Sequence, residues 1–411
     1  MRIDRWLISV MIILLVISAI TFAVKSRRRQ NGGAADVPFD PGSLSVLVIG
    51  IEGLDLETFE RLSAEGRLPN LSALAAGGTL AEFETLGRSV DARIAWTSLV
   101  TGVSPENQGI GGTRMSLRGK RVQSPLTSKS RTVGTLWTAL SEAGTPVGVL
   151  GWWGTWPVEK LDGVVVAPYT TYYLERKKDG RPETLVSPLE MLPRIDPHVL
   201  WPESYSRMDL ARFVNTDEGL GMEALIGKGY EDLAMAYAGD NSMTRVARLL
   251  TIDPGVEAEF VLLTGIETVC QIFWLKAHTE DVDWDYLSES TRRILIGQIP
   301  ALKDVIDLYY EFVDERVGEL LELAADDATI AVVSSHGYDR LRYGSNRQPL
   351  LGNEMHDETG FWIMSGPRVS RGLRVEGLDM LDFAPTFAAA AGIELDDKVE
   401  GEVSEEAIAP D

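Results

Sequence analysis

The stretch SVLVIGI (Ser45–Ile51) decides the fold of this chain, and Glu52 follows it directly. A short, continuous run of β-branched and other apolar residues is typical of a strand buried on both faces of a parallel sheet. Such runs alternate with helical patterns along the chain, which predicts a doubly wound α/β sheet with helices on both faces. Further strands are expected at 147–152, 164–167, 260–264, 330–334 and 361–364, and helices at 56–64, after Pro69, and at 93–100, 133–143, 232–250, 298–324 and 380–391.

The composition fits a large globular body and excludes several classes of protein. The chain has 411 residues, of which 45% are hydrophobic and 24% are charged, and it contains one cysteine. These values exclude a disordered chain and a disulfide scaffold. Lys and Arg number 39 against 61 Asp and Glu, which gives a net charge of −22. Nucleic acid repels so acidic a body, and we therefore expect no nucleic-acid partner.

The N-terminus carries a membrane signal. Trp6–Val24 is uncharged and mostly apolar, and about 20 such residues in a helix span the hydrocarbon core of a bilayer. We expect residues 1–29 to form an uncleaved, single-pass transmembrane helix rather than a cleaved export signal, with residues 30–42 as a linker. The basic flank Lys25–Arg29 favours a cytoplasmic body by the positive-inside rule.

Residues 43–402 are expected to form the main domain, followed by a C-terminal tail at 403–411. Within that domain, residues 169–229 are rich in charge, proline and aromatic residues and show little strand pattern. We interpret them as an inserted cap region packed over one edge of the sheet.

Polar residues end several of the predicted strands and mark a candidate site. Glu52, Glu267 and the pair Ser335-His336 each follow a buried run. Ligands of open α/β sheets bind beyond the carboxyl ends of the strands, so these side chains are expected at one functional edge. The alternative is that strand ends are polar because they meet solvent.

A series of segments in a fixed order carries a family resemblance. They are VLVIGIEGLD (Val46–Asp55), IAWTSLVTGVSPENQGI (Ile94–Ile110), VGVLGWWGTWPVEKLDGVVV (Val147–Val166), LLTGIETVCQIFW (Leu262–Trp274), VVSSHGYD (Val332–Asp339), HDETGFWIMSGP (His356–Pro367) and LDMLDFAPTF (Leu378–Phe387). In these segments the chain resembles the alkaline phosphatase superfamily, specifically its type I phosphodiesterase/nucleotide pyrophosphatase branch. The resemblance implies an alkaline-phosphatase-like fold over most of the chain.

The resemblance also implies phosphoryl transfer at a two-metal site. In that family two metal ions, usually zinc, clamp the phosphate and activate a Thr or Ser nucleophile at the start of a helix. Carried over by motif, Glu52 and His336 are the retained ligands of one metal. Glu267 and His356 are the retained ligands of the other.

Several family positions are altered in this chain. The nucleophile position is Ala92, which has no hydroxyl, while Gln271 replaces a histidine ligand and Ser335 replaces a carboxylate ligand. Zinc sites normally use three or four protein ligands, so two ligands per site would hold a metal weakly. The usual family mechanism cannot run with these residues.

Three rearrangements remain open. In the first, Asp91 or Ser89 substitutes for the nucleophile after a one-residue slip, although we favour a helix-capping role for them. In the second, the four retained ligands pool into one shared metal site. In the third, Asp55 or Asp339 is recruited as an extra ligand, although each is more typical of a solvated loop.

We therefore interpret the chain as a membrane-anchored, phosphodiesterase-like protein that is catalytically impaired and binds a phosphorylated ligand or a protein partner. The alternative is an active metal-dependent phosphodiester hydrolase with a remodelled site. The cofactor is zinc or another divalent metal, weakly held, or none. The resemblance implies an extracytoplasmic domain, against the basic flank. The tryptophans Trp152, Trp153 and Trp156 either flank a ligand or pack in the core, and we expect packing.

Overall fold

The computed structural model describes residues 37–87, 90–109, 114–117, 120–123, 127–168, 170, 182–215, 228–282, 284–338 and 356–410. The predicted transmembrane helix at residues 1–29 lies outside these ranges. Within the ranges, no helix is long and apolar enough to cross a membrane.

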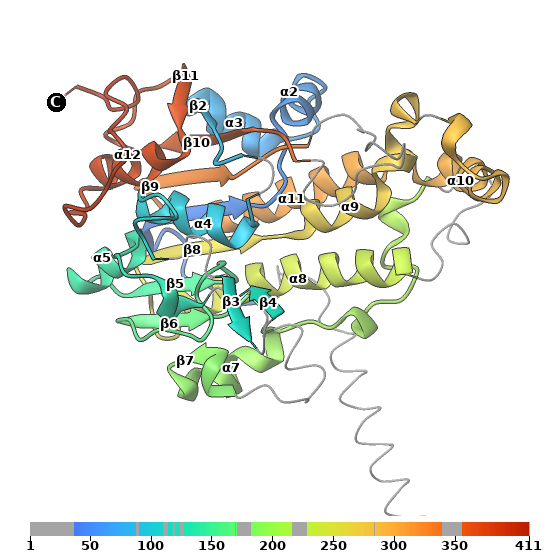
Figure 1. Ribbon diagram of the computed structural model, residues 1–411. Coiled ribbons are helices and arrows are strands. Elements are labelled where there is room, and N and C mark those ends of the chain that lie inside the picture. The colour runs from blue at the N-terminus through green and yellow to red at the C-terminus, as the bar shows by residue number, and fades with distance from the viewer. Residues whose placement is uncertain are drawn as a thin grey trace, which may run out of the picture.

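A nine-stranded mixed sheet forms the centre of the molecule (Figure 1). Its central strand, β1, pairs in parallel with β8 on one side and with β9 on the other. The expectation of a parallel sheet needs correction, because β10 runs antiparallel to both of its neighbours and β7 runs antiparallel to β6. From one edge to the other, the strands are β11 (Leu373–Asp379), β2 (Thr79–Glu84), β10 (Thr359–Ser365), β9 (Ala324–Ser334), β1 (Leu44–Ile51), β8 (Ala258–Leu263), β5 (Val147–Leu150), β6 (Gly163–Val166) and β7 (Val186–Ser187).

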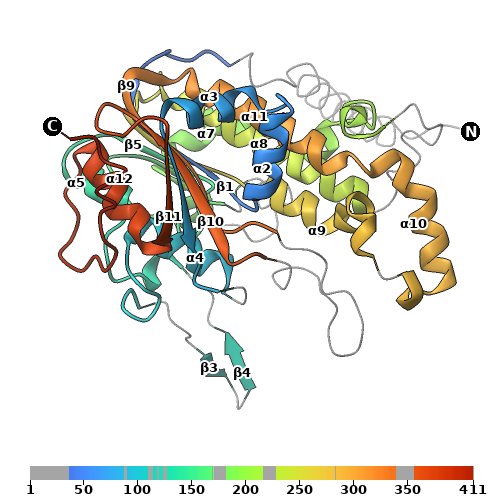
Figure 2. The ribbon, with the colours of Figure 1, turned by 90° about the horizontal axis from the view of Figure 1, so that it is seen from above.

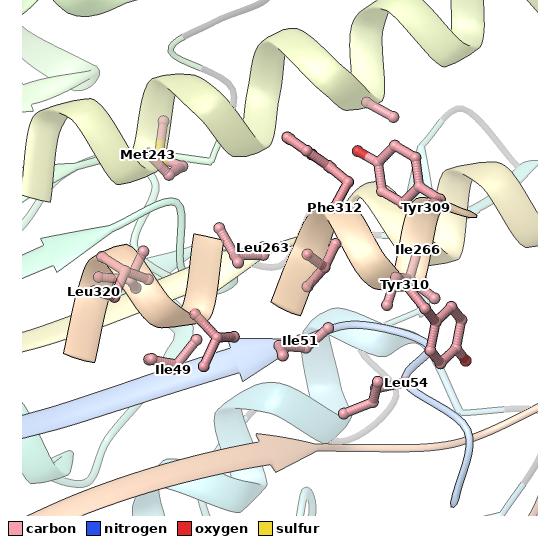
Figure 3. Close-up of a cluster of buried hydrophobic side chains, with 14 of the residues drawn as sticks. Ile49, Ile51, Leu54, Met243, Leu263, Ile266, Tyr309, Tyr310, Phe312 and Leu320 are labelled. Carbon is pink, nitrogen blue, oxygen red and sulfur yellow. The ribbon is translucent and has the colours of Figure 1, made fainter. Parts of the chain in front are cut away.

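The apolar run of β1 serves two hydrophobic cores, one on each face of the sheet. Val46 and Val48 belong to one core, whereas Ile49 and Ile51 belong to the other. The alternation follows from the two-residue period of a strand. Figure 3 shows Ile49 and Ile51 facing α11, where Leu320 packs in the same cluster. Full burial of each such side chain stabilises the fold by about 1.5–3 kcal/mol, which is why the strand is apolar on both sides.

Helices cover both faces of the sheet, as the sequence predicts. In Figure 2, α3, α8 and α11 lie along one side of the strands and α4 and α12 along the other. One layer contains α2 (Leu56–Ala64), α3 (Pro69–Gly77), α8 (Lys228–Leu250), α9 (Gly265–Ala277) and α11 (Val305–Leu321), and the other contains α4 (Ala92–Thr101), α5 (Leu136–Glu142) and α12 (Phe383–Ala391).

One predicted helix is wrong. The pattern at 298–324 suggests a single helix, but α10 (Glu289–Leu302) ends before α11 begins at Val305. The chain then enters β9 at Ala324. The apolar spacing continues across the break, so periodicity alone does not locate it.

The segment predicted as a cap is described over residues 182–215. It consists of short 3-10 turns, the short helix α7 (Leu192–Ile195) and β7, which forms the edge of the sheet beside β6. The predicted boundary at 169 lies outside the described residues, and the one at 229 falls in the first turn of α8. Elsewhere, β3 (Arg114–Leu117) and β4 (Lys120–Gln123) pair as a separate hairpin.

Candidate metal centre

Three strand ends bring the predicted site residues to one edge of the sheet. Glu52 directly follows β1, and Glu267 lies in the first turn of α9, which follows β8. His336 lies just beyond the end of β9. Because β8 and β9 flank β1 in parallel, their carboxyl ends meet at the same edge.

Glu267, His336 and His356 form a compact group at this edge. One ligand atom from each lies within 4.8 Å of the others. His356 Nε2 and Glu267 Oε1 are 3.1 Å apart, and the rings of His336 and His356 stack with their centroids 3.7 Å apart. All three side chains are buried or nearly so. Two imidazoles and one carboxylate are a donor set that zinc accepts.

His336 presents a ring nitrogen that suits a metal. Its Nδ1 lies 3.3 Å from the carbonyl oxygen of Gly337, so Nδ1 carries the proton in the tautomer that makes this hydrogen bond. Its Nε2 is buried and has no hydrogen-bond partner within the described part of the chain. Burial lowers the pKa of His336 to about 4, so the ring is neutral at pH 7. A neutral imidazole with a bare buried nitrogen fits a metal ion.

Glu267 is held ionised by its neighbours. The hydroxyl of Tyr338 donates to its Oε2 at 2.5 Å, and Gln271 Nε2 donates to its Oε1. Burial opposes ionisation, but the hydrogen bonds and the adjacent imidazoles of His356 and His336 outweigh it and lower the pKa of Glu267. Gln271 therefore supports the ligand Glu267 from the position where the family has a histidine.

Glu52 lies beside the three-residue group but outside it. Its backbone carbonyl accepts from the N–H of Glu267 at 3.1 Å, and its Oε1 accepts from Trp153 Nε1 at 3.0 Å. Burial and the negative charge of Glu267 raise the pKa of Glu52 well above its usual range. A carboxyl that tends to keep its proton is better suited to proton transfer than to metal binding.

The start of α4 has no free nucleophile in the described residues. Ala92 is the first helical residue, and Asp91 caps the helix by accepting from the backbone N–H of Arg93 at 3.0 Å. The Arg93 guanidinium also pairs with both Asp91 oxygens. These bonds outweigh the effect of burial and lower the pKa of Asp91. Ser89, the other predicted substitute, lies outside the described residues.

The remaining predicted residues take different roles. Asp55 is buried and caps α2 by accepting from the N–H of Thr58 at 2.8 Å. Its burial differs from the solvated loop that the sequence suggests. The Ser335 hydroxyl is buried and has no partner among the described residues, whereas Asp339 lies outside them.

The sequence did not predict the contacts that Trp153 and Tyr338 make with the site. Trp152 packs in the core against Trp96 and Trp137, as expected of these tryptophans. Trp153, in contrast, reaches Glu52. The contact between Tyr338 and Glu267 has one sequence signal: Tyr338 follows His336 closely at the same strand end.

Comparison with known proteins tests the predicted resemblance. No curated protein matches it. A candidate sulfatase from Bacteroides thetaiotaomicron superposes with a TM-score of 0.50 at 13% identity, covering 88% of this chain and 74% of that one. This likeness supports the alkaline-phosphatase-like fold.

Two other solved structures match less well. Murine ectonucleotide pyrophosphatase/phosphodiesterase 5 gives a TM-score of 0.45 at 12% identity, with 89% of this chain and 100% of that one covered. A phosphonate monoester hydrolase from Silicibacter pomeroyi gives 0.42 at 16% identity, covering 88% and 76%. The family model described as type I phosphodiesterase / nucleotide pyrophosphatase matches residues 46–218. The predicted resemblance to the type I phosphodiesterase/nucleotide pyrophosphatase family is confirmed over these residues.

Proposed function

We propose that this chain binds one divalent metal ion through Glu267, His336 and His356 and uses it to bind a phosphorylated ligand, without covalent turnover. The observation that carries the proposal is a contrast between two parts of the site. Three ligand atoms lie within 4.8 Å of one another, whereas the start of α4 offers Ala92 and an Asp91 already paired with Arg93.

The three donors support a single site rather than two. Each predicted family metal site keeps only two candidate ligands, and the closeness of Glu267, His336 and His356, which come from both predicted sites, supports one shared site. Three protein ligands are the usual number for a zinc site with an open position. When bound there, a divalent ion supplies Lewis-acid polarisation of a phosphoryl oxygen. The protein then provides binding of the phosphate group, and no described side chain at α4 provides the attack.

A second candidate function is an active phosphodiester hydrolase with a remodelled site. Glu52 favours it, because its buried carboxyl sits beside Glu267, and burial and that negative charge raise its pKa, as suits a group that transfers a proton. Trp153 holds that carboxyl through one hydrogen bond. In this second function Glu52 transfers the proton, and Ala92 takes no part in the hydrolysis.

Metal content and turnover of the full chain distinguish these functions. We expect one equivalent of zinc or manganese after dialysis, measured by elemental analysis and by titration calorimetry. His336→Ala combined with His356→Ala should abolish binding. His278→Ala is the matched control, because that histidine is half-buried and stacks on Trp274 outside the group.

Turnover is measured on the same samples with a chromogenic phosphodiester. No turnover with stoichiometric metal supports the binding function. Turnover that chelation and Glu52→Gln both abolish supports the hydrolase instead. A chain that holds no metal, or a double histidine variant that still binds it, refutes the proposal.

We also infer that residues 1–29 anchor the chain in a membrane and that the domain at 43–402 faces the extracytoplasmic side. The support for the anchor is the apolar run at residues 6–24. The support for the orientation is the extracytoplasmic location that the family resemblance implies. Carbonate extraction of membranes and protease treatment of intact cells test the two parts. Release by carbonate contradicts the anchor, and full protection from protease contradicts the orientation.

A further inference from the structure

A buried aspartate on a neighbouring helix caps the start of α9. Asp240 of α8 accepts hydrogen bonds from the backbone N–H groups of Thr264 and Gly265, at 3.1 and 3.2 Å. Thr264 is the N-cap residue of α9, and its own side chain makes no capping bond. The Asp240 carboxyl oxygen therefore satisfies helix N–H groups that would otherwise lack a partner.

The cap is fixed in place by a third helix. Tyr309 of α11 donates its hydroxyl to Asp240 Oδ2 at 2.9 Å, and both residues are buried. Figure 3 shows the Tyr309 side chain rising from α11 toward α8. A Cβ atom on Gly265 would lie 2.0 Å from the Tyr309 hydroxyl and 2.2 Å from Asp240 Oδ2. The start of α9 therefore packs so tightly between α8 and α11 that residue 265 has no room for a side chain.

The tightly packed turn carries a proposed metal ligand. Glu267 is two residues beyond Gly265, in the same first turn. Its backbone N–H donates to the carbonyl of Glu52, which ties the turn to the end of β1 as well. A shift of this turn therefore moves the Glu267 carboxylate relative to His336 and His356.

We propose that Asp240 is a positioning residue for the metal centre: it fixes the first turn of α9 and thereby holds the Glu267 carboxylate where His336 and His356 can share an ion with it. The inference rests on the proposed function, because it concerns the same three ligands. Asp240 itself touches none of them. Partners that orient metal ligands typically change metal affinity by about 10–100-fold when they are removed.

The chain contains a matched control for the capping role. Asp314 of α11 is also buried and caps another helix, α3, by accepting from the N–H groups of Asn70 and Leu71 at 3.1 and 2.8 Å. That helix carries none of the three ligands. Asp314→Ala therefore removes the same kind of interaction at a place where it cannot move Glu267.

The test compares zinc affinity and thermal stability of the full chain and four variants. Affinity is measured by competition with a chromophoric chelator, and the ligand field by the visible absorption spectrum of the cobalt-loaded protein. We expect Asp240→Ala to bind zinc about 10–100-fold more weakly and to alter the cobalt spectrum. Asp314→Ala should lose stability but keep its affinity within about twofold and its spectrum unchanged, since additivity holds for independent sites.

Asp240→Asn keeps an acceptor oxygen for the two N–H groups, so it should recover most of the affinity. It also provides a folded variant if Asp240→Ala does not fold. A normal affinity and spectrum in Asp240→Ala or in Asp240→Leu, neither of which can accept from the two N–H groups, overturns the inference. An equal loss of affinity in Asp314→Ala and the Asp240 variants also overturns it. A wild-type chain that binds no zinc overturns the proposed function and the inference together, whereas normal wild-type binding with unaffected Asp240 variants overturns the inference alone.

Discussion

Glu259 of β8 is a fully buried carboxyl whose two oxygens have no hydrogen-bond partner among the described residues. It shares a strand face with Val261 and Leu263 of the hydrophobic core, and its side chain lies close to Gly148 of β5, as does that of Leu250. Burial alone raises the pKa of Glu259 well above its usual range. We predict that this residue destabilises the fold and that Glu259→Leu makes the chain more stable.

The magnitude follows from two effects. A buried polar group without a partner costs about 1–3 kcal/mol even when neutral, and leucine removes that cost. In addition, the folded chain keeps the Glu259 proton to a higher pH than the unfolded chain does. Unfolding therefore releases a proton between the two pKa values, and the wild type loses stability as pH rises through that window. The loss is about 1.4 kcal/mol per pH unit relative to the leucine variant.

Urea unfolding followed by tryptophan fluorescence, at several pH values from about 5.5 to 7.5, measures the difference in unfolding free energy. Glu259→Gln cannot ionise but keeps an unpaired polar group. It should therefore remove the pH dependence that Glu259 contributes, and it should gain less stability over the wild type than Glu259→Leu does. Glu257→Gln, at an exposed position just before the strand, should change stability by less than about 0.5 kcal/mol. A difference between wild type and Glu259→Leu that stays constant with pH would refute the reasoning.

Three further predictions concern the site and its surroundings. Asp91→Ala should lower the unfolding free energy by about 0.5–2 kcal/mol through loss of the α4 cap and leave zinc affinity unchanged in calorimetry; weaker zinc binding would contradict a capping role. Tyr338→Phe removes the hydroxyl that donates to Glu267 and should weaken zinc binding by about tenfold or more, and an unchanged dissociation constant would count against that contact. Cys270 is buried and its thiol pKa is raised by burial, so it should react with Ellman's reagent only when the chain unfolds; rapid labelling of the native chain would show that the core opens there.

Sequence patterns located the central strands of the sheet better than the two strands at its β11 side. The apolar run of β1 is unmistakable because both of its faces are buried. The strands β2 and β11 were not predicted, and β11 is mostly exposed or half-buried along its length. An edge strand with Arg374 and Glu376 on its exposed face resembles a loop in composition, because its single neighbour and not its sequence holds it extended.

The candidate site was predictable as a list of residues but not as an arrangement. The motifs named Glu52, Glu267, His336 and His356 by position, and assigned them in pairs to two metals. The structure brings Glu267, His336 and His356 together and leaves Glu52 beside them. The difference depends on contacts that no spacing encodes, such as the stacking of the two imidazoles and the hydrogen bond from Trp153 to Glu52.

The predicted nucleophile position and the candidate ligand Glu267 lie in different layers of the fold. Ala92 begins α4, which packs in the core on one face of the sheet, whereas Glu267 lies in the first turn of α9 in the layer on the other face. A substitution at the start of α4 therefore leaves the packing that holds Glu267 intact. The residue type at position 92 and the arrangement of Glu267 are then physically independent, since the described contacts that fix Asp240 and the first turn of α9 come from α8 and α11 and not from Ala92. For the same reason metal affinity and turnover must be measured separately in this chain, because neither one predicts the other.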